Sequence, residues 1–211
     1  SEVQTDGRDY FYRNKMEYAL YYSHEDGLIH LAFHGRGSHR KVIAESSSLE
    51  RPEIYARAQE IVRELNAKHA EARNFQSLLL RCDQSGHVEG GLFENHQPRP
   101  KFPNLEDQIL GQQYSYSPNG FFQINLPVYE MALREIKNWV NTAEVLDLYA
   151  GVGTIGLSVA RDKNLTLVEC DKSAYREMQH NCEGTGAKAI LARSESALEY
   201  IQPAQTVILD P

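Results

Sequence analysis

The sequence predicts an α/β protein with two domains, a small α+β domain over residues 1–108 and a parallel-sheet domain over residues 109–211. In the second half, short apolar segments alternate with segments of helical periodicity, which is typical of a parallel sheet with crossover helices. In the first half, apolar runs lie on either side of Asp26-Gly27 and of Ser85-Gly86, which predicts two hairpins. Three prolines within residues 97–103 indicate a connector between the domains.

The first domain is expected to combine the two hairpins with one helix. The hairpins pair residues 18–23 with 28–33 and residues 76–82 with 87–93. The helix covers residues 52–69, because apolar residues recur there at helical spacing and Pro52 suits a first helical turn. The expected apolar face of this helix consists of Ile54, Ala58, Ile61, Val62 and Leu65.

The second domain is expected to alternate helices and strands in chain order. Helices are predicted at 126–140, 154–161, 173–183 and 195–200, and strands at 144–149, 165–170, 188–192 and 206–209. In an open sheet of this kind, ligands bind at the carboxyl ends of the strands. We therefore look for functional residues in the loops that follow these strands.

Composition excludes several classes of protein. The chain has 211 residues, a net charge of −7 and three cysteines that are far apart and form no C-x-x-C pair. We expect no disulfide framework, no metal or Fe–S site from this chain and a reducing, cytoplasmic compartment. The sequence has no run of about 18 apolar residues that would span a membrane, and its polar start predicts no signal peptide. The acidic balance disfavours non-specific coating of nucleic acid, which leaves a local basic patch as the possible contact.

The most informative segment is a glycine-rich turn after the first strand of the second domain. Residues 145–156 read Val-Leu-Asp-Leu-Tyr-Ala-Gly-Val-Gly-Thr-Ile-Gly, and glycines let a backbone approach a ligand closely. Glu169 ends the next strand, where a carboxylate can accept hydrogen bonds from both ribose hydroxyls of a nucleoside. The pattern alone also fits the dinucleotide site of a nicotinamide-dependent dehydrogenase. Asp147 and Asp210 favour S-adenosylmethionine: Asp147 either faces its cationic methionine end or organises the turn, and Asp210 suits its amino group or a methyl acceptor.

Several separated segments resemble the RNA uracil-C5 methyltransferases, which make 5-methyluridine in transfer and ribosomal RNA. The resemblance implies a class I (Rossmann-like) S-adenosylmethionine methyltransferase core, preceded by an α+β central domain, with RNA as the partner. It covers nearly the whole chain. The segments that carry it are Tyr-Arg-Asn-Lys-Met-Glu at 12–17, Gly-Arg-Gly-Ser-His-Arg at 35–40, Ser-Pro-Asn-Gly-Phe-Phe-Gln-Ile-Asn at 117–125, the glycine turn at 146–156 and Leu-Asp-Pro at 209–211.

The resemblance also implies roles for individual residues. Gln123 would contact the cofactor, Glu169 would bind the ribose, and Asp210 would lie between the cofactor and the target base. Ser194 stands at the adenine position, where many members of the family have Asp or Asn. The cofactor-binding residues expected in this way are Gln123, Tyr149, Gly151, Gly153, Thr154, Glu169, Ser194 and Asp210, and the candidates for contacts with RNA phosphates are Arg13, Arg36, His39 and Arg40.

The family's chemistry, as the resemblance implies, is covalent. A cysteine thiolate adds to carbon 6 of uracil, and a glutamate later removes the proton from carbon 5. In the family both residues follow an Asp-Pro-Pro-Arg segment, whereas this sequence ends at Asp210-Pro211, and neither Cys170 nor Cys182 is placed to replace the nucleophile. We therefore expect a fragment with an incomplete sheet and no catalytic residue of its own, inactive alone, from an enzyme that methylates uridine in rRNA or tRNA.

Alternative functions stay open at this point. An Asp-Pro-Pro segment after the fourth strand also serves methyltransferases that act on an exocyclic amine of a nucleic-acid base, which need no cysteine. A non-catalytic module that binds the cofactor or RNA fits the same residues. The dehydrogenase is the weakest alternative, and a titration with both nucleotides separates it from the others.

Overall fold

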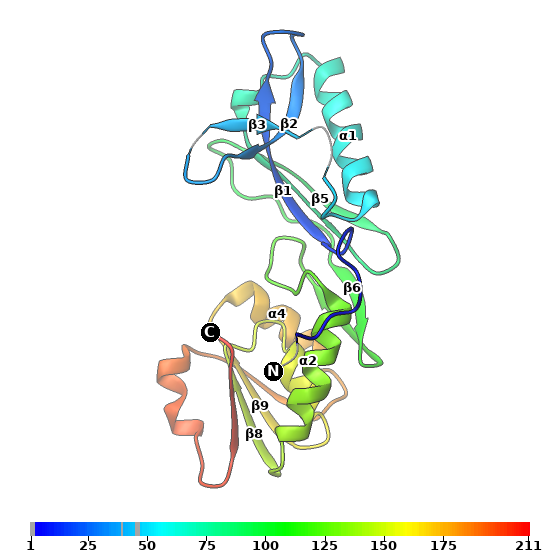
Figure 1. Cartoon of the computed structure of the whole chain (residues 1–211). Helices are drawn as coiled ribbons and strands as arrows, with labels where there is room; N and C mark the ends of the chain where they lie inside the picture. The colour runs from blue at the N-terminus through cyan, green and yellow to red at the C-terminus, as the bar shows by residue number, and fades with distance from the viewer. Residues whose placement is uncertain (1–2, 39, 45–46) are drawn as a thin grey trace. The chain divides into compact units, whose positions relative to one another are not determined.

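The computed structural model divides the chain into two compact units, and it describes residues 3–38, 40–44 and 47–211 (Figure 1). The N-terminal unit is Gly7–Leu105, and the C-terminal unit combines Glu106–Pro211 with the first residues of the chain up to Asp6. Among the described residues, no helix is long and apolar enough to cross a membrane.

The N-terminal unit is a five-stranded antiparallel sheet with one helix against it. Its strand order is β3-β2-β1-β4-β5, and helix α1 contacts β2 and β4. Both predicted hairpins are confirmed, since β1 pairs with β2 and β4 pairs with β5. The elements are β1 (Lys15–Tyr22), β2 (Ile29–His34), β3 (Lys41–Ile43), α1 (Pro52–Ala67), the 3-10 turn η1 (Ala72–Asn74), β4 (Phe75–Cys82) and β5 (Val88–Glu94).

Helix α1 supplies much of the apolar core of this unit. All five residues of the predicted apolar face are buried, and burial of each Ile, Val or Leu side chain stabilises the fold by about 1.5–3 kcal/mol. The helix begins at Pro52 as predicted. It ends at Ala67 rather than at residue 69, because His69 adopts a positive φ of 51°, which a right-handed helix does not allow.

The C-terminal unit contains a four-stranded parallel sheet in the order β10-β9-β8-β11. Because β8 is central, with β9 on one side and β11 on the other, the chain reverses its winding direction at β8, where open α/β sheets bind ligands. The elements are α2 (Leu126–Trp139), β8 (Glu144–Leu148), α3 (Thr154–Ala160), β9 (Asn164–Glu169), α4 (Lys172–Asn181), β10 (Lys188–Leu191), η2 (Ser194–Tyr200) and β11 (Thr206–Leu209).

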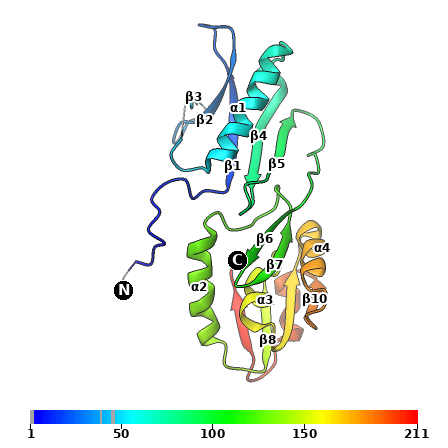
Figure 2. The same ribbon diagram turned by 90° about the vertical axis from the view of Figure 1, so that its right-hand side faces the viewer.

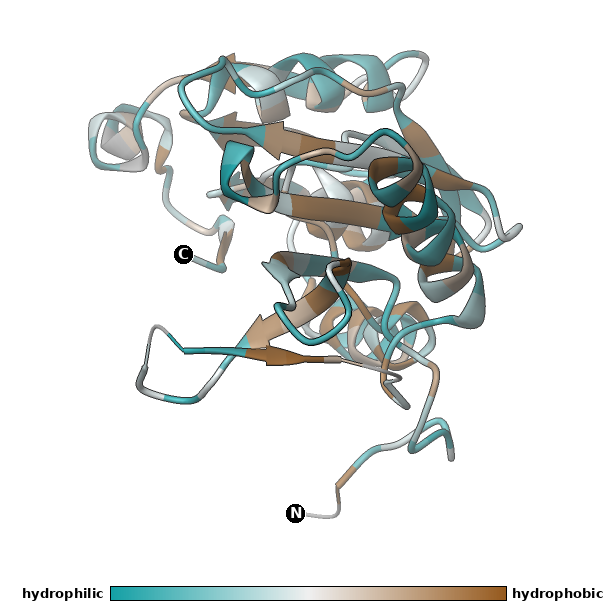
Figure 3. Cartoon of the chain, turned by 90° about the horizontal axis from the view of Figure 1, so that it is seen from above, coloured by the Kyte–Doolittle hydropathy of each residue, from teal (hydrophilic) through white to brown (hydrophobic). Residues whose placement is uncertain are grey.

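The two faces of this sheet carry different elements. Leu146, Leu148 and Val168 form an apolar cluster with Ala197 of η2 on one face. Asp147 points to the other face and bonds to α3, which itself contacts α2 (Figure 2). The strands carry many of the hydrophobic residues, as the brown arrows of Figure 3 show.

A short hairpin precedes the parallel sheet and was not predicted. It joins β6 (Leu105–Ile109) to β7 (Gln112–Tyr116) through a turn at Gly111, which has a φ of 79°. Alternate residues of β6 are buried, but one of them is Asp107. The hydroxyl of Tyr116 donates a hydrogen bond of 2.5 Å to Asp107 Oδ2. This buried carboxylate interrupts the apolar alternation that would have revealed the strand.

Candidate cofactor-binding site

The glycine turn leads from β8 into α3 through three residues with positive φ. These angles are 61° at Tyr149, 57° at Gly151 and 88° at Gly153, which is the N-cap residue of α3. Glycine adopts such angles without strain, whereas Tyr149 does so at a cost of about 1–3 kcal/mol. Strain of this kind concentrates at functional sites.

Asp147 organises the turn from inside the protein. Its side chain is buried, and Oδ2 accepts a hydrogen bond of 2.8 Å from the backbone N–H of Gly156. A Cβ atom at Gly156 would lie 2.7 Å from Leu167 Cδ2 and 2.8 Å from Asp147 Oδ2, so only glycine fits there. Burial is the main cause that raises the pKa of Asp147 to about 7; the carboxylates of Asp210 and Glu169 add to the shift, and the hydrogen bond from Gly156 opposes it.

Replacing Asp147 with asparagine is expected to weaken the dependence of stability on pH. The pKa rises from 3.8 to about 7 on folding, so the folded chain binds more protons than the unfolded chain within this window. Stability of the natural protein therefore falls as the pH rises from about 4 to 7, by at most about 4 kcal/mol. Urea unfolding between about pH 4 and pH 8 should show the variant gaining relative to the natural protein as the pH rises. A difference that stays constant with pH would contradict the buried, neutral carboxyl.

Glu169 holds the turn from the neighbouring strand. Its Oε2 accepts a hydrogen bond of 2.8 Å from the backbone N–H of Gly151. Its Oε1 accepts hydrogen bonds of 2.7 Å from the backbone N–H groups of Cys170 and Asp171. A carboxylate has about four lone-pair positions, and three of them are used here, so Glu169 can accept one further hydrogen bond from a ligand while holding the turn.

A pocket lies against the outer side of this turn. It brings together five of the predicted residues, Gln123, Tyr149, Gly151, Thr154 and Asp210. The pocket is open to solvent and its volume is only about 70 Å³, so a nucleoside would lie across the turn rather than inside a closed cavity. The remaining lining residues are Phe121, Phe122, Tyr129, Ala150, Val152 and Ile155.

Three other predicted cofactor residues have different positions. Glu169 adjoins the pocket through its bond to Gly151. Gly153 is buried, and a Cβ atom there would meet Leu157 and Met178, which indicates a packing role. Ser194 is the first residue of η2, and its side chain lies outside the described part of the chain.

The described candidates for contacts with RNA lie in the N-terminal unit. Arg36 and Arg40 are exposed in the loop between β2 and β3. Arg13 is half-buried, and its backbone forms an isolated parallel β-bridge with that of Glu50. His39 lies outside the described residues.

Sequence reasoning assigned no role to Phe122, which precedes Gln123, or to Tyr129 of α2. The ring of Phe122 stacks on that of Tyr116, with centroids 3.8 Å apart, and so fixes the segment that carries Gln123. Asn125 caps α2 by accepting a hydrogen bond from the N–H of Val128, which places Tyr129 in the first turn of the helix. The only signal in the sequence was a tyrosine six residues after Gln123, near the start of the predicted helix.

None of the three cysteines lines this pocket. Cys82 and Cys182 are buried, and Cys170 is exposed. Desolvation and the adjacent Glu169 carboxylate raise the pKa of the Cys170 thiol, which is the opposite of what activates a nucleophile. Among the described residues, no group of three or more His, Cys, Asp or Glu side chains is arranged to hold a metal.

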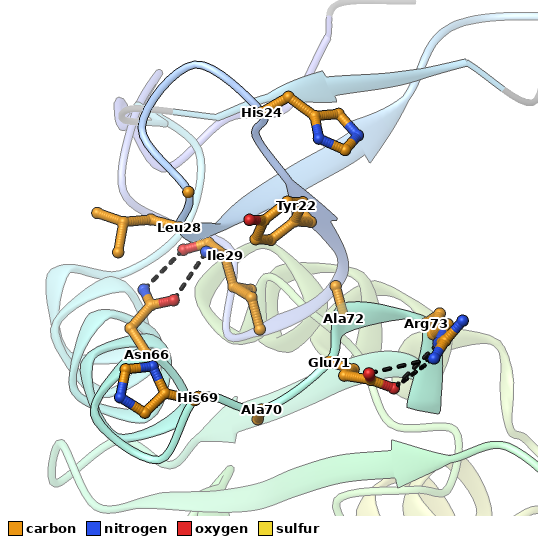
Figure 4. Close-up of a pocket in the computed structure, with 11 residues that line it drawn as sticks. Tyr22, His24, Leu28, Ile29, Asn66, His69, Ala70, Glu71, Ala72 and Arg73 are labelled. Carbon is orange, nitrogen blue, oxygen red and sulfur yellow. Dashed lines mark hydrogen bonds and ion pairs between the residues drawn. The ribbon is translucent and has the colours of Figure 1, made fainter.

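A larger pocket of about 620 Å³ lies in the N-terminal unit, between the β1–β2 turn and the end of α1 (Figure 4). The side-chain amide of Asn66 bonds both backbone groups of Ile29, and Arg73 pairs with Glu71. Tyr22 and His24 contribute rings to its rim. None of the predicted site residues lines it.

Comparison with known proteins finds a family model that matches the C-terminal unit and relatives that match part of the chain. A family model described as "Conserved hypothetical protein 95" matches residues 127–211. An uncharacterized RNA methyltransferase of Protochlamydia amoebophila is 33% identical over 119 residues, which are 52% of this chain and 30% of that protein. The human tRNA (uracil-5-)-methyltransferase homolog A is 34% identical over 83 residues, which are 37% of this chain and 13% of that protein.

A solved structure matches both units of the chain. It is that of the Pyrococcus abyssi tRNA (uracil-54, C5)-methyltransferase in complex with S-adenosyl-L-homocysteine, with a TM-score of 0.76 and 19% identity. The match covers 97% of this chain and 61% of that one. The fold is thus that of a class I methyltransferase with a preceding α+β domain, as predicted. The chain is thus similar in sequence to RNA methyltransferases, a tRNA uracil-5 enzyme among them, and similar in fold to a tRNA uracil-C5 methyltransferase.

Proposed function

We propose that this chain is the cofactor-binding part of a cytoplasmic enzyme that methylates carbon 5 of uridine in tRNA or rRNA. The chain spans only about a third of the length of the first curated relatives, 30% and 31%, so the activity of the whole protein is an inference. The observation that carries it is one pocket at the central strand that unites Gln123, Tyr149, Thr154 and Asp210 beside the glycine turn.

Different residues of the site would bind different parts of the cofactor. Bound S-adenosylmethionine would supply an electrophilic methyl group. Glu169 would accept a hydrogen bond from the ribose, and the glycine turn would allow the backbone to approach the ligand. Asp210, at the exposed end of β11, would provide negative charge near the methionine end, while Gln123 approaches from the segment before α2.

Tritium release from carbon 5 of uracil tests the reaction on the protein that carries this chain. RNA transcribed with tritium at that carbon should release it into water when S-adenosylmethionine is added, because methylation at carbon 5 displaces the hydrogen. Methylation of an exocyclic amine would transfer the methyl group without releasing tritium. That outcome would replace the proposed acceptor while leaving the cofactor site intact.

A further inference from the structure

The pocket beside the glycine turn has an unbalanced charge. Asp210 is the only charged side chain among the described residues that line it, and the lining contains no Lys, Arg or His. The buried carboxyl of Asp147 lies close enough to Asp210 for the two to influence each other. Such surroundings favour a positively charged ligand group over a negatively charged one.

Tyr129 adds an unused polar group to this pocket. Its side chain lines the pocket from the first turn of α2, and its hydroxyl has no hydrogen-bond partner among the described residues. The hydroxyl is also not among the fully buried polar atoms without a partner in the described residues, so its oxygen keeps some accessible surface. Burial, followed by the carboxylates of Asp147 and Asp210, raises the pKa of Tyr129. The phenol therefore stays neutral and keeps its lone pairs for a donor.

We propose that the Tyr129 hydroxyl, together with Asp210, binds the ammonium group at the amino-acid end of the cofactor, an assignment that rests on the proposed function. The phenol oxygen would accept one N–H of the ammonium group, and the Asp210 carboxylate would supply the opposite charge. Tyr129 is thus a binding residue that selects the amino group and has no part in holding the adenosine.

Three ligands separate this role from a structural one. The first is S-adenosylhomocysteine, the second is its decarboxylated analogue, which keeps the amino group, and the third is its deaminated analogue, which keeps the carboxylate. Calorimetric titration of Tyr129→Phe should show a loss of affinity of about tenfold for the first two, since hydrogen bonds to charged groups have this size. Affinity for the deaminated analogue should stay within about twofold of the natural protein.

A matched control is Tyr114→Phe, which removes another tyrosine hydroxyl from the same unit. The Tyr114 hydroxyl is buried and lies 2.7 Å from Ser158 Oγ, so its loss should lower stability without discriminating between the three ligands. Equal losses for all three ligands in Tyr129→Phe, or no loss for any of them, would overturn the assignment. If the folded natural protein bound none of the three, the proposed cofactor site itself would be wrong, and this assignment with it.

Discussion

Replacing Glu169 with alanine is expected to lower the affinity for S-adenosylhomocysteine by about 100-fold. The lone-pair position left on Glu169 can accept one charge-assisted hydrogen bond from the ribose, worth up to about 3 kcal/mol, which corresponds to a factor of about 100 in affinity. The substitution also removes the acceptor for the backbone N–H groups of Gly151, Cys170 and Asp171. The turn would lose its anchor to β9 as well as its ligand contact. Isothermal titration calorimetry measures the loss directly.

Glu169→Gln separates the two contributions. The carboxylate has two acceptor oxygens, whereas the amide of glutamine has one oxygen and one NH₂ group. The NH₂ group would therefore face a backbone N–H donor, either that of Gly151 or those of Cys170 and Asp171. Glu169→Gln should therefore also bind S-adenosylhomocysteine weakly, although the glutamine side chain has the same size as that of glutamate. Glu183→Ala is the matched control, because Glu183 is an exposed glutamate of the same unit that forms an ion pair with the exposed His180. Affinity that survives in Glu169→Gln and Glu169→Ala would contradict the proposed role of Glu169.

Gly90→Ala is expected to destabilise the N-terminal unit by about 3 kcal/mol or more. Gly90 lies opposite Leu80 in the β4–β5 pair and has a φ of 129°. A Cβ atom there would lie 2.2 Å from the carbonyl oxygen of Leu79 and 3.0 Å from Leu80 Cα. Both are backbone atoms of the neighbouring strand, so no side chain can move to relieve the clash. The strands would have to separate.

Gly37→Ala serves as the control for this effect. Gly37 has a positive φ of 67° in the same unit, but a Cβ atom there would meet nothing within 4 Å. Its cost should be limited to backbone strain, about 1–2 kcal/mol. Thermal unfolding followed by circular dichroism should therefore give a much lower midpoint temperature for Gly90→Ala than for Gly37→Ala. Equal midpoints would show that the clash at Gly90 is relieved.

The sequence was sufficient for the parts of the fold that follow local rules. Glycines at 151 and 153 predicted the turn, and apolar periodicity predicted α1 with its buried face, because both patterns are set by neighbours along the chain. The β6–β7 hairpin was missed because Asp107 faces inward with Tyr116 as its partner. A buried polar pair of this kind is not recognisable before the strands are placed.

The candidate site was predictable where its residues follow strand ends. Gln123 came from the resemblance and Asp210 from its place after the fourth strand, and both line the pocket. Two roles of Asp147 were open in the sequence, and its burial beside Gly156 selects the organisation of the turn. Tyr129 could not be assigned in advance, because the direction of a helical side chain depends on how α2 packs against α3.

The central claim is that the glycine turn of this chain binds S-adenosylmethionine. Calorimetric titration of the unmodified chain with S-adenosylhomocysteine tests it most directly, with a nicotinamide dinucleotide as the competing ligand. The account predicts saturable binding of S-adenosylhomocysteine, one molecule per chain, and none of the dinucleotide. Binding of the dinucleotide instead, or no binding of S-adenosylhomocysteine by a folded chain, would contradict it.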